Sequence, residues 1–188
     1  MIDRLFRAEL AVDGRNVSGW CVPFDVEATV NDGDGPYVEV FKRGAFRNVV
    51  RGCGDGAHTV RLYYLHDRGT SNDELMQWVG KTTSLREHER GLWGEFRLDD
   101  FVRNERARIV GYKIEDGQLP ALSVSFVPGK TNTYERDGVL VRERLTVKLV
   151  DHIAIVPEGA YPMLEPLAVR ARTRTSSVDT WRAWRNAL

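Results

Sequence analysis

The chain has 188 residues, of which 42% are apolar and 29% are charged, the balance of an ordinary soluble globular protein. This length is enough for one domain with a substantial core and is short for two. Lysine and arginine together number 27, as do aspartate and glutamate, so no net charge directs the protein to nucleic acid or to a membrane surface.

Alternating apolar and polar residues dominate the first half of the chain and predict β-strands. Turn-forming residues separate the first two strands at Asp13–Asn16 and fill a loop at 31–36. A short helix is expected at Arg43–Val50, and a polar loop at 68–74. The strands expected in this half are Leu5–Val12, Val17–Phe24, Tyr37–Phe41 and His58–His66.

The second half is predicted to contain one good helix among further strands. The helix covers Asp100–Ile114, because Asp99 or Asp100 can cap it, apolar residues line one side, and Gly117 ends it. The strands expected here are Gln77–Thr83 and Leu92–Leu98, which form a hairpin, followed by Ala121–Val127, Val139–Lys148 and Val150–Val156.

About eight strands and one internal helix predict a mainly β protein with flanking helices, an α+β fold. We expect a closed or partly closed β-barrel with the helices packed outside it. Residues 1–165 are expected to form this barrel. Beyond them the composition changes, and residues 166–188 are expected to be a basic linker followed by a short C-terminal helix.

Arg142 and Arg144 are interpreted as exposed strand charges. The alternative is that they hold a loop or a water molecule in place.

The sequence lacks the patterns typical of disulfide frameworks, metal sites, transmembrane helices and signal peptides. Cys21 and Cys53 form neither a CxxC motif nor a disulfide framework, so we expect reduced thiols in a cytosolic protein, with a nucleophilic cysteine as the minor alternative. The four histidines lack short ligand spacings, so no metal and no cofactor is expected. No apolar stretch approaches the roughly 18 residues of a transmembrane helix. The first residues lack the apolar core of a signal peptide, so none is expected.

Three side chains with catalytic chemistry lie in separate strand-like runs, namely His66, Ser123 and His152. A serine hydroxyl needs a base to accept its proton, and the base needs a third group to orient it. Ser123 is the candidate nucleophile and His152 the candidate orienting group. His66 is the candidate base, because an unperturbed imidazole titrates near pH 6.5, about where a base is needed. A triad is recognised by its geometry, so only the fold can join these distant segments.

Each role has competitors in the sequence. Ser125 lies two residues after Ser123, so both side chains face the same side of a strand. Asp151 competes with His152, because a carboxylate offers a developing imidazolium the negative charge that a neutral imidazole lacks. Neighbours on a strand point to opposite faces, so only one of this pair can face the base unless a bulge intervenes. Asp67 is a further orienting option, and purely structural roles for the serine and histidines stay open.

Five short motifs follow one another along the chain. They are Phe41–Phe46 (FKRGAF), Tyr64–Asp67 (YLHD), Arg90–Leu92 (RGL), Leu122–Phe126 (LSVSF) and His152–Pro157 (HIAIVP). In this order they resemble the motifs of the tailed-phage prohead serine proteases, which mature capsids, and the similarity runs from about residue 5 to about residue 167. The resemblance implies a fold shared with the herpesvirus maturation protease, a β-barrel ringed by helices whose third triad member is a second histidine.

The resemblance implies a serine endopeptidase with a catalytic triad of Ser123, His66 and His152. Its peptide substrates would be the major capsid protein precursor or the scaffold, and its own tail. It would act in the host cytoplasm inside the assembling prohead, as a possible homo-oligomer without nucleic acid or membrane partners. Two positions depart from the usual motifs, Ser125 where glycine is common and His152 where an acid is common. The alternatives are an inactive assembly or scaffolding protein that retains the barrel, and a β-barrel binding module.

Overall fold

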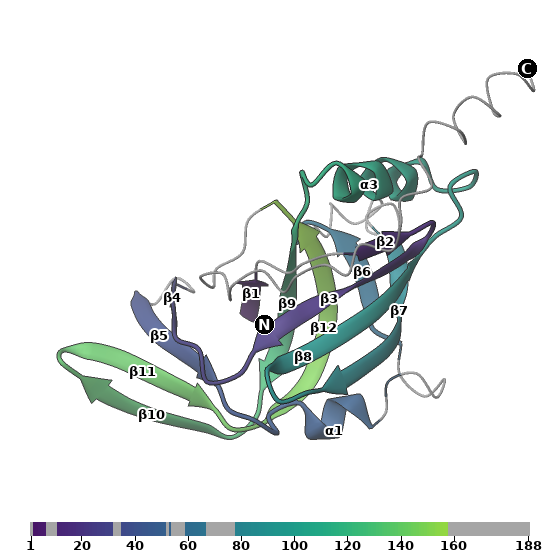
Figure 1. Cartoon of the computed structure of the whole chain (residues 1–188). Helices are drawn as coiled ribbons and strands as arrows, with labels where there is room; N and C mark the ends of the chain where they lie inside the picture. The colour runs from purple at the N-terminus through teal and green to yellow at the C-terminus, as the bar shows by residue number, and fades with distance from the viewer. Residues whose placement is uncertain are drawn as a thin grey trace, which may run out of the picture.

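Twelve strands and two helices form the described part of the chain (Figure 1), which in this computed structural model comprises residues 2–6, 11–31, 35–51, 53, 59–66 and 78–157. The helices are α1 (Arg47–Val50) and α3 (Glu105–Glu115). The strands are β1 (Ile2–Phe6), β2 (Ala11–Asp13), β3 (Asn16–Pro23), β4 (Ala28–Asn31), β5 (Pro36–Phe41), β6 (Arg61–Tyr64), β7 (Trp78–Glu87), β8 (Gly91–Leu98), β9 (Ala121–Pro128), β10 (Thr131–Arg136), β11 (Val139–Arg144) and β12 (Val147–Val156).

Eight strands form one sheet in the order β1-β9-β12-β6-β7-β8-β3-β2, and four form a second in the order β10-β11-β5-β4. The large sheet curls, as Figure 1 shows, yet its edge strands β1 and β2 do not pair with each other. The predicted mainly β fold is confirmed, while the closed form of the barrel is wrong. A closed barrel leaves no edge strand, and the described strands of this sheet end in two edges, so it is an open half-barrel.

The centre of the large sheet separates an apolar face from a face with polar groups. β12 runs parallel to β6 and antiparallel to β9, so these three strands lie side by side. Along β9, the side chains of Leu122, Val124 and Phe126 enter the core and are fully buried. Because successive side chains of a strand alternate between faces, Ser123 and Ser125 lie on the opposite face.

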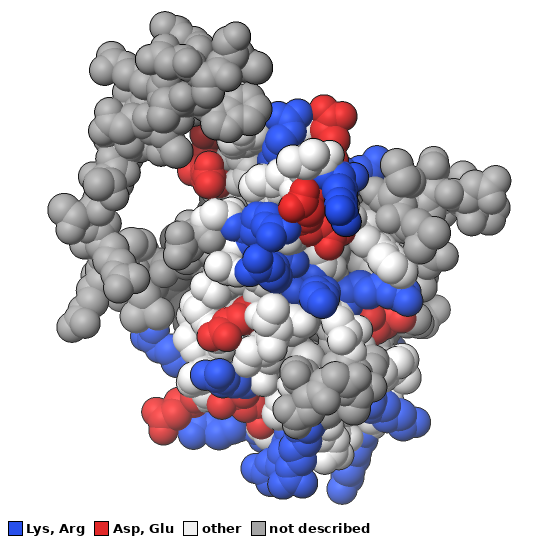
Figure 2. All heavy atoms as spheres, turned by 90° about the vertical axis from the view of Figure 1, so that its right-hand side faces the viewer, with Lys and Arg blue, Asp and Glu red and all other residues white. Residues whose placement is uncertain are grey.

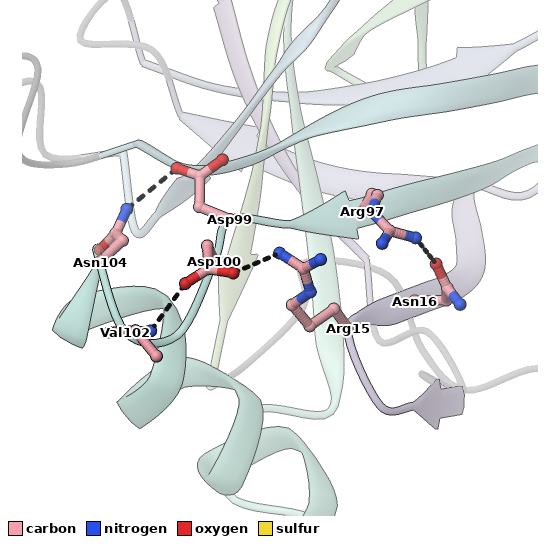
Figure 3. A network of polar contacts seen from close by, with 7 residues as sticks. All are labelled: Arg15, Asn16, Arg97, Asp99, Asp100, Val102 and Asn104. Atoms are coloured by element: carbon pink, nitrogen blue, oxygen red, sulfur yellow. Dashed lines mark hydrogen bonds and ion pairs between the residues drawn. The ribbon is translucent and has the colours of Figure 1, made fainter.

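The helix predicted to start at Asp100 starts at Glu105 as α3, because Asn104 caps it. The Asn104 side-chain oxygen accepts a hydrogen bond from a backbone N–H of the first turn at 3.0 Å, and its amide donates to the Trp78 carbonyl and to Asp99. Asp100 instead accepts from the turn before the helix and pairs with Arg15 (Figure 3). The two aspartates predicted as caps therefore stabilise the loop that leads into the helix.

Several predicted strand bounds differ from the observed ones. The strand predicted over 139–148 is two strands, because β11 pairs in the second sheet and β12 in the large one. Between them, the carbonyl and hydroxyl oxygens of Thr146 accept hydrogen bonds from Gly129 and Lys130. β4 and β10 were not predicted. β10 is polar and largely exposed, so it lacks the apolar alternation of a half-buried strand. The predicted strand over 5–12 overlaps β1 and β2, and residues 7–10 lie outside the described residues, as do the predicted linker and C-terminal helix.

The second sheet contains a buried ion pair. Arg144 donates from its Nε to Glu39 at 2.7 Å, and the two side chains are 4% and 0% exposed. The guanidinium also donates to Thr131 and to the Tyr37 hydroxyl. The interpretation of Arg144 as an exposed strand charge is therefore wrong. Arg142 on the same strand is partly buried, with its guanidinium 4.0 Å from the centre of the Tyr37 ring.

We expect Glu39→Gln to lower the free energy of unfolding by about 3–5 kcal/mol, because it leaves the buried guanidinium of Arg144 without its counter-charge. Urea denaturation followed by circular dichroism measures this loss. Glu27→Gln is the matched control, since Glu27 makes a bidentate pair with Arg136 but both side chains are about half exposed. The control should lose much less. Equal losses in the two variants would contradict the role of burial.

Candidate active site

The candidate base, His66, lies just beyond the end of β6. The preceding residue, Leu65, has a φ of 60° and donates its backbone N–H to the carbonyl of Ile155 on β12 at 3.0 Å. A left-handed conformation is unfavourable for a residue other than glycine and is often held at active sites. At this turn the chain leaves the sheet, and the His66 imidazole is brought toward the polar side chains of β9 and β12.

The candidate nucleophile, Ser123, lies in the middle of β9, opposite Ala154 of β12. Its hydroxyl oxygen is within hydrogen-bonding distance of His66 Nε2. The side chain of Ser123 has no exposed surface, whereas His66 is half-buried. A substrate carbonyl can therefore reach this hydroxyl only when neighbouring atoms move aside. Exclusion of water strengthens every electrostatic interaction within such a site.

The candidate orienting group, His152, lies on β12 and is 2% exposed. Its Nε2 is 3.0 Å from Nδ1 of His66, the nitrogen on the far side of the ring from Ser123. The Tyr63 ring packs beside His152 with the ring centres 4.8 Å apart. The fold therefore brings together all three residues that the sequence singled out.

The competitor Asp151 contacts His152, on the side of its ring away from His66. Its Oδ2 is 2.6 Å from Nδ1 of His152. The sequence presented Asp151 and His152 as alternatives for one position, and the structure includes both in a chain of contacts that begins at Ser123 and passes through His66. The further option Asp67 lies outside the described residues.

Ser125, the competing nucleophile, is fully buried opposite His152 in the strand register. Its hydroxyl makes no hydrogen bond in the structure, the only such buried side-chain atom found among the described residues. The Ser125 hydroxyl therefore makes no hydrogen bond to a base, while the Ser123 hydroxyl contacts His66.

The two cysteines are poorly suited to nucleophilic chemistry. Cys21 is fully buried on β3, and burial raises the pKa of its thiol, with the neighbouring Cys53 adding to the effect. Burial also raises the pKa of Cys53, partly opposed by a backbone hydrogen bond involving Val60. Because the thiolate is the nucleophile, both thiols are largely unreactive near neutral pH.

We therefore expect any activity of this site to survive thiol reagents. Treatment with iodoacetamide at pH 7.5 should alkylate Cys21 and Cys53 much more slowly in the folded protein than after unfolding, because burial raises the pKa of both thiols and so lowers the fraction of reactive thiolate. Intact mass measures the labelling, and a urea-unfolded sample is the positive control. Rapid labelling of Cys53 with parallel loss of activity would instead favour a cysteine mechanism.

Positive charge lies beside the histidine pair. Arg61 of β6 is opposite His152 in the strand register, Lys81 of β7 is opposite Arg61, and Arg97 of β8 is opposite Lys81. All three cations are exposed, and none forms an ion pair with a carboxylate of the described residues. Figure 2, which views the molecule from the β7 side, shows Lys and Arg side chains gathered across this face. Like charges on neighbouring strands repel each other, so this row of cations disfavours a further positive charge on the histidine pair at its end.

No described group of three His, Cys, Asp or Glu side chains has the arrangement of a metal site. Within the same ranges, neither helix is long and apolar enough to span a membrane.

A comparison with models of protein families found one family for this chain. A family model described as Caudovirus prohead serine protease matches residues 6–177, most of the chain. No curated protein matches the sequence. Among solved structures, the chain is similar to the capsid assembly protease of bacteriophage T4, with 10% sequence identity and a TM-score of 0.39, over 82% of this chain and 99% of that one.

Proposed function

Because this chain belongs to the Caudovirus prohead serine protease family, we propose that it is a serine endopeptidase with a Ser-His-His triad that cleaves a capsid or scaffold precursor. The observation that supports this proposal best is the line of contacts from Ser123 through His66 to His152. It supplies a nucleophile, a base and an orienting group in the order that the chemistry requires.

In the proposed acylation, Ser123 Oγ attacks the carbonyl carbon of the scissile peptide bond while its proton passes to His66 Nε2. The carbonyl oxygen becomes a tetrahedral oxyanion. When this intermediate collapses, the bond from carbon to nitrogen breaks and His66 gives its proton to the leaving amine. The products are a free amine and an ester between the substrate acyl group and Ser123.

Deacylation repeats these steps with water. His66 Nε2 takes a proton from the attacking water, the ester carbon passes through a second tetrahedral intermediate, and the proton then returns to Ser123 Oγ as the acid leaves. His152 holds the His66 ring through its Nδ1 side during both half-reactions, so that Nε2 keeps facing the hydroxyl.

The substrate of this proposed reaction is the precursor of the phage major capsid protein or its scaffold, cleaved inside the assembling prohead in the host cytoplasm. The protein's own tail is a second proposed substrate, because residues 170–177 are arginine-rich, poor in apolar side chains and therefore suited to cleavage. Residues 166–188 would then be a processing segment attached to the protease domain. We propose no nucleic-acid or membrane partner, and the proposal is compatible with a homo-oligomer.

The test is to incubate the major capsid protein precursor of the same phage with the purified full chain and to identify products by mass spectrometry. A defined internal cleavage supports the proposal. An intact precursor, together with no labelling of Ser123 by a fluorophosphonate probe, would instead favour the second candidate, an inactive assembly protein that retains the protease fold. The motif departure at Ser125 favours that candidate. Intact mass of the protease after incubation tests self-processing separately.

A further inference from the structure

We propose that Asp151 is a positioning residue of this site, whose carboxylate fixes the tautomers of His152 and His66 and stabilises the imidazolium that forms on His66. The inference rests on the proposed function, since it concerns the same pair of histidines. It extends the proposed Ser-His-His triad to a chain of four side chains that ends in a negative charge.

A β-bulge makes the contact between Asp151 and His152 possible. In a regular strand, adjacent side chains point to opposite faces and do not meet. Here the pairing of β12 with β9 shifts register between Val150, opposite Phe126, and His152, opposite Ser125, so Asp151 is the extra residue. Bulges re-aim side chains and occur often beside active sites. The result is a carboxylate 2.6 Å from His152 Nδ1, with the Asp151 side chain 26% exposed.

An ionised carboxylate can only accept hydrogen bonds, so the contact sets the direction of every bond in the chain. Asp151 accepts from His152 Nδ1, which leaves Nε2 of a neutral His152 as an acceptor. His66 Nδ1 must then donate to His152, and its Nε2 carries the lone pair that faces Ser123. This is the tautomer in which His66 can take the serine proton.

The carboxylate also offsets an unfavourable charge environment. On β6, Arg61 lies opposite His152 in the strand register, and the Tyr63 ring packs against the His152 ring. His66, just after β6, contacts His152 as well. On β9 the facing residues are uncharged serines. Beyond Arg61 the row of cations continues across the sheet. Among the described residues, Asp151 is therefore the acid placed on the histidine pair, where it counteracts the positive field when His66 becomes protonated.

The first test measures tautomers and needs no substrate. The chain has four histidines, so in ¹⁵N-histidine-labelled protein each ring can be assigned by substituting one at a time. In the wild type, above the pH at which the rings titrate, His152 is expected as the Nδ1–H form. In Asp151→Asn, His152 should no longer be held in this one tautomer, because an amide side chain can donate a hydrogen bond as well as accept one. Glu135→Gln, which removes an exposed carboxylate on β10, should leave it unchanged. An Nε2–H form of His152 in the wild type overturns the proposal.

The second test is kinetic. Asp151→Asn should lower kcat by about 10- to 100-fold, the loss typical when a carboxylate that hydrogen-bonds the far nitrogen of a metal-bound histidine is removed. It should also move the acidic limb of the rate profile to lower pH, because without the carboxylate the imidazolium is less stable. In a His152→Ala background the same change should cost nothing more, because its effect passes through that ring. Unchanged rates and pH profile in Asp151→Asn overturn the proposal. An inactive wild type with the Nδ1–H form of His152 would instead sink the proposed function alone.

Discussion

Ser123→Ala is expected to stop cleavage of the capsid precursor while the protein stays folded. The substitution removes the atom that would form the acyl-enzyme, and loss of the nucleophile lowers kcat by about 10⁶-fold in a serine protease. The hydroxyl is small and fully buried, so its removal should change the free energy of unfolding by only about 1 kcal/mol. Mass spectrometry of the precursor measures the first effect, and urea denaturation the second.

Ser125→Ala is the matched control for this experiment. The two serines share a strand, a face and complete burial, but only Ser123 contacts His66. The Ser125 variant should therefore retain most of its activity, and a fluorophosphonate probe should label it as it labels the wild type. An inactive Ser125→Ala together with an active Ser123→Ala would show that the nucleophile lies two residues further along β9.

The sequence predicted the three candidate site residues because each lies in or beside an apolar run that could be read as a strand. The alternation along β9 separates Ser123 from the core residues on either side, and this pattern is visible without a structure. The motifs then indicated which of the serines and of the four histidines to select as site residues. What joined them was the sheet order β9-β12-β6, which no local pattern encodes, because strand neighbours are chosen by long-range pairing.

The role of Asp151 was hidden for a physical reason. Alternation predicts that Asp151 and His152 diverge, and this is correct for a regular strand. A bulge depends on how β12 pairs with β9, so it is a property of two strands and is absent from the sequence of either. The same limit explains the burial of Arg144: its partner Glu39 lies on β5, far away in the sequence.

The open edges of the large sheet also could not be predicted from the sequence. About eight predicted strands are compatible with either a closed or an open barrel, because closure depends on strand tilt and stagger as well as on strand number. The division of the predicted strand at 139–148 is another example. There Thr146 lies between β11 and β12, and its hydrogen bonds with Gly129 and Lys130 form only when the chain folds back.

Removal of either histidine of the site should also reduce activity, but by different amounts. His66→Ala is expected to lower kcat by about 10⁶-fold, as much as loss of the nucleophile, because the two act as a unit. His152→Ala should cost about 10²- to 10⁴-fold, since it removes orientation while His66 can still exchange protons. Rates of precursor cleavage by the two variants measure the difference. His88→Ala, which changes a histidine on the β7–β8 turn outside the site, is the control and should be near wild type.

The comparison with Asp151→Ala then decides which group orients the base. In the structure His66 Nδ1 contacts His152, and Asp151 reaches only the far nitrogen of that ring. The loss in His152→Ala should therefore be at least as large as the loss in Asp151→Ala, because removing His152 also disconnects the carboxylate. A large loss in Asp151→Ala with a nearly normal His152→Ala would mean that the carboxylate orients His66 directly. In that case Asp151 would be the third member of the triad in the active protein, in direct contact with His66.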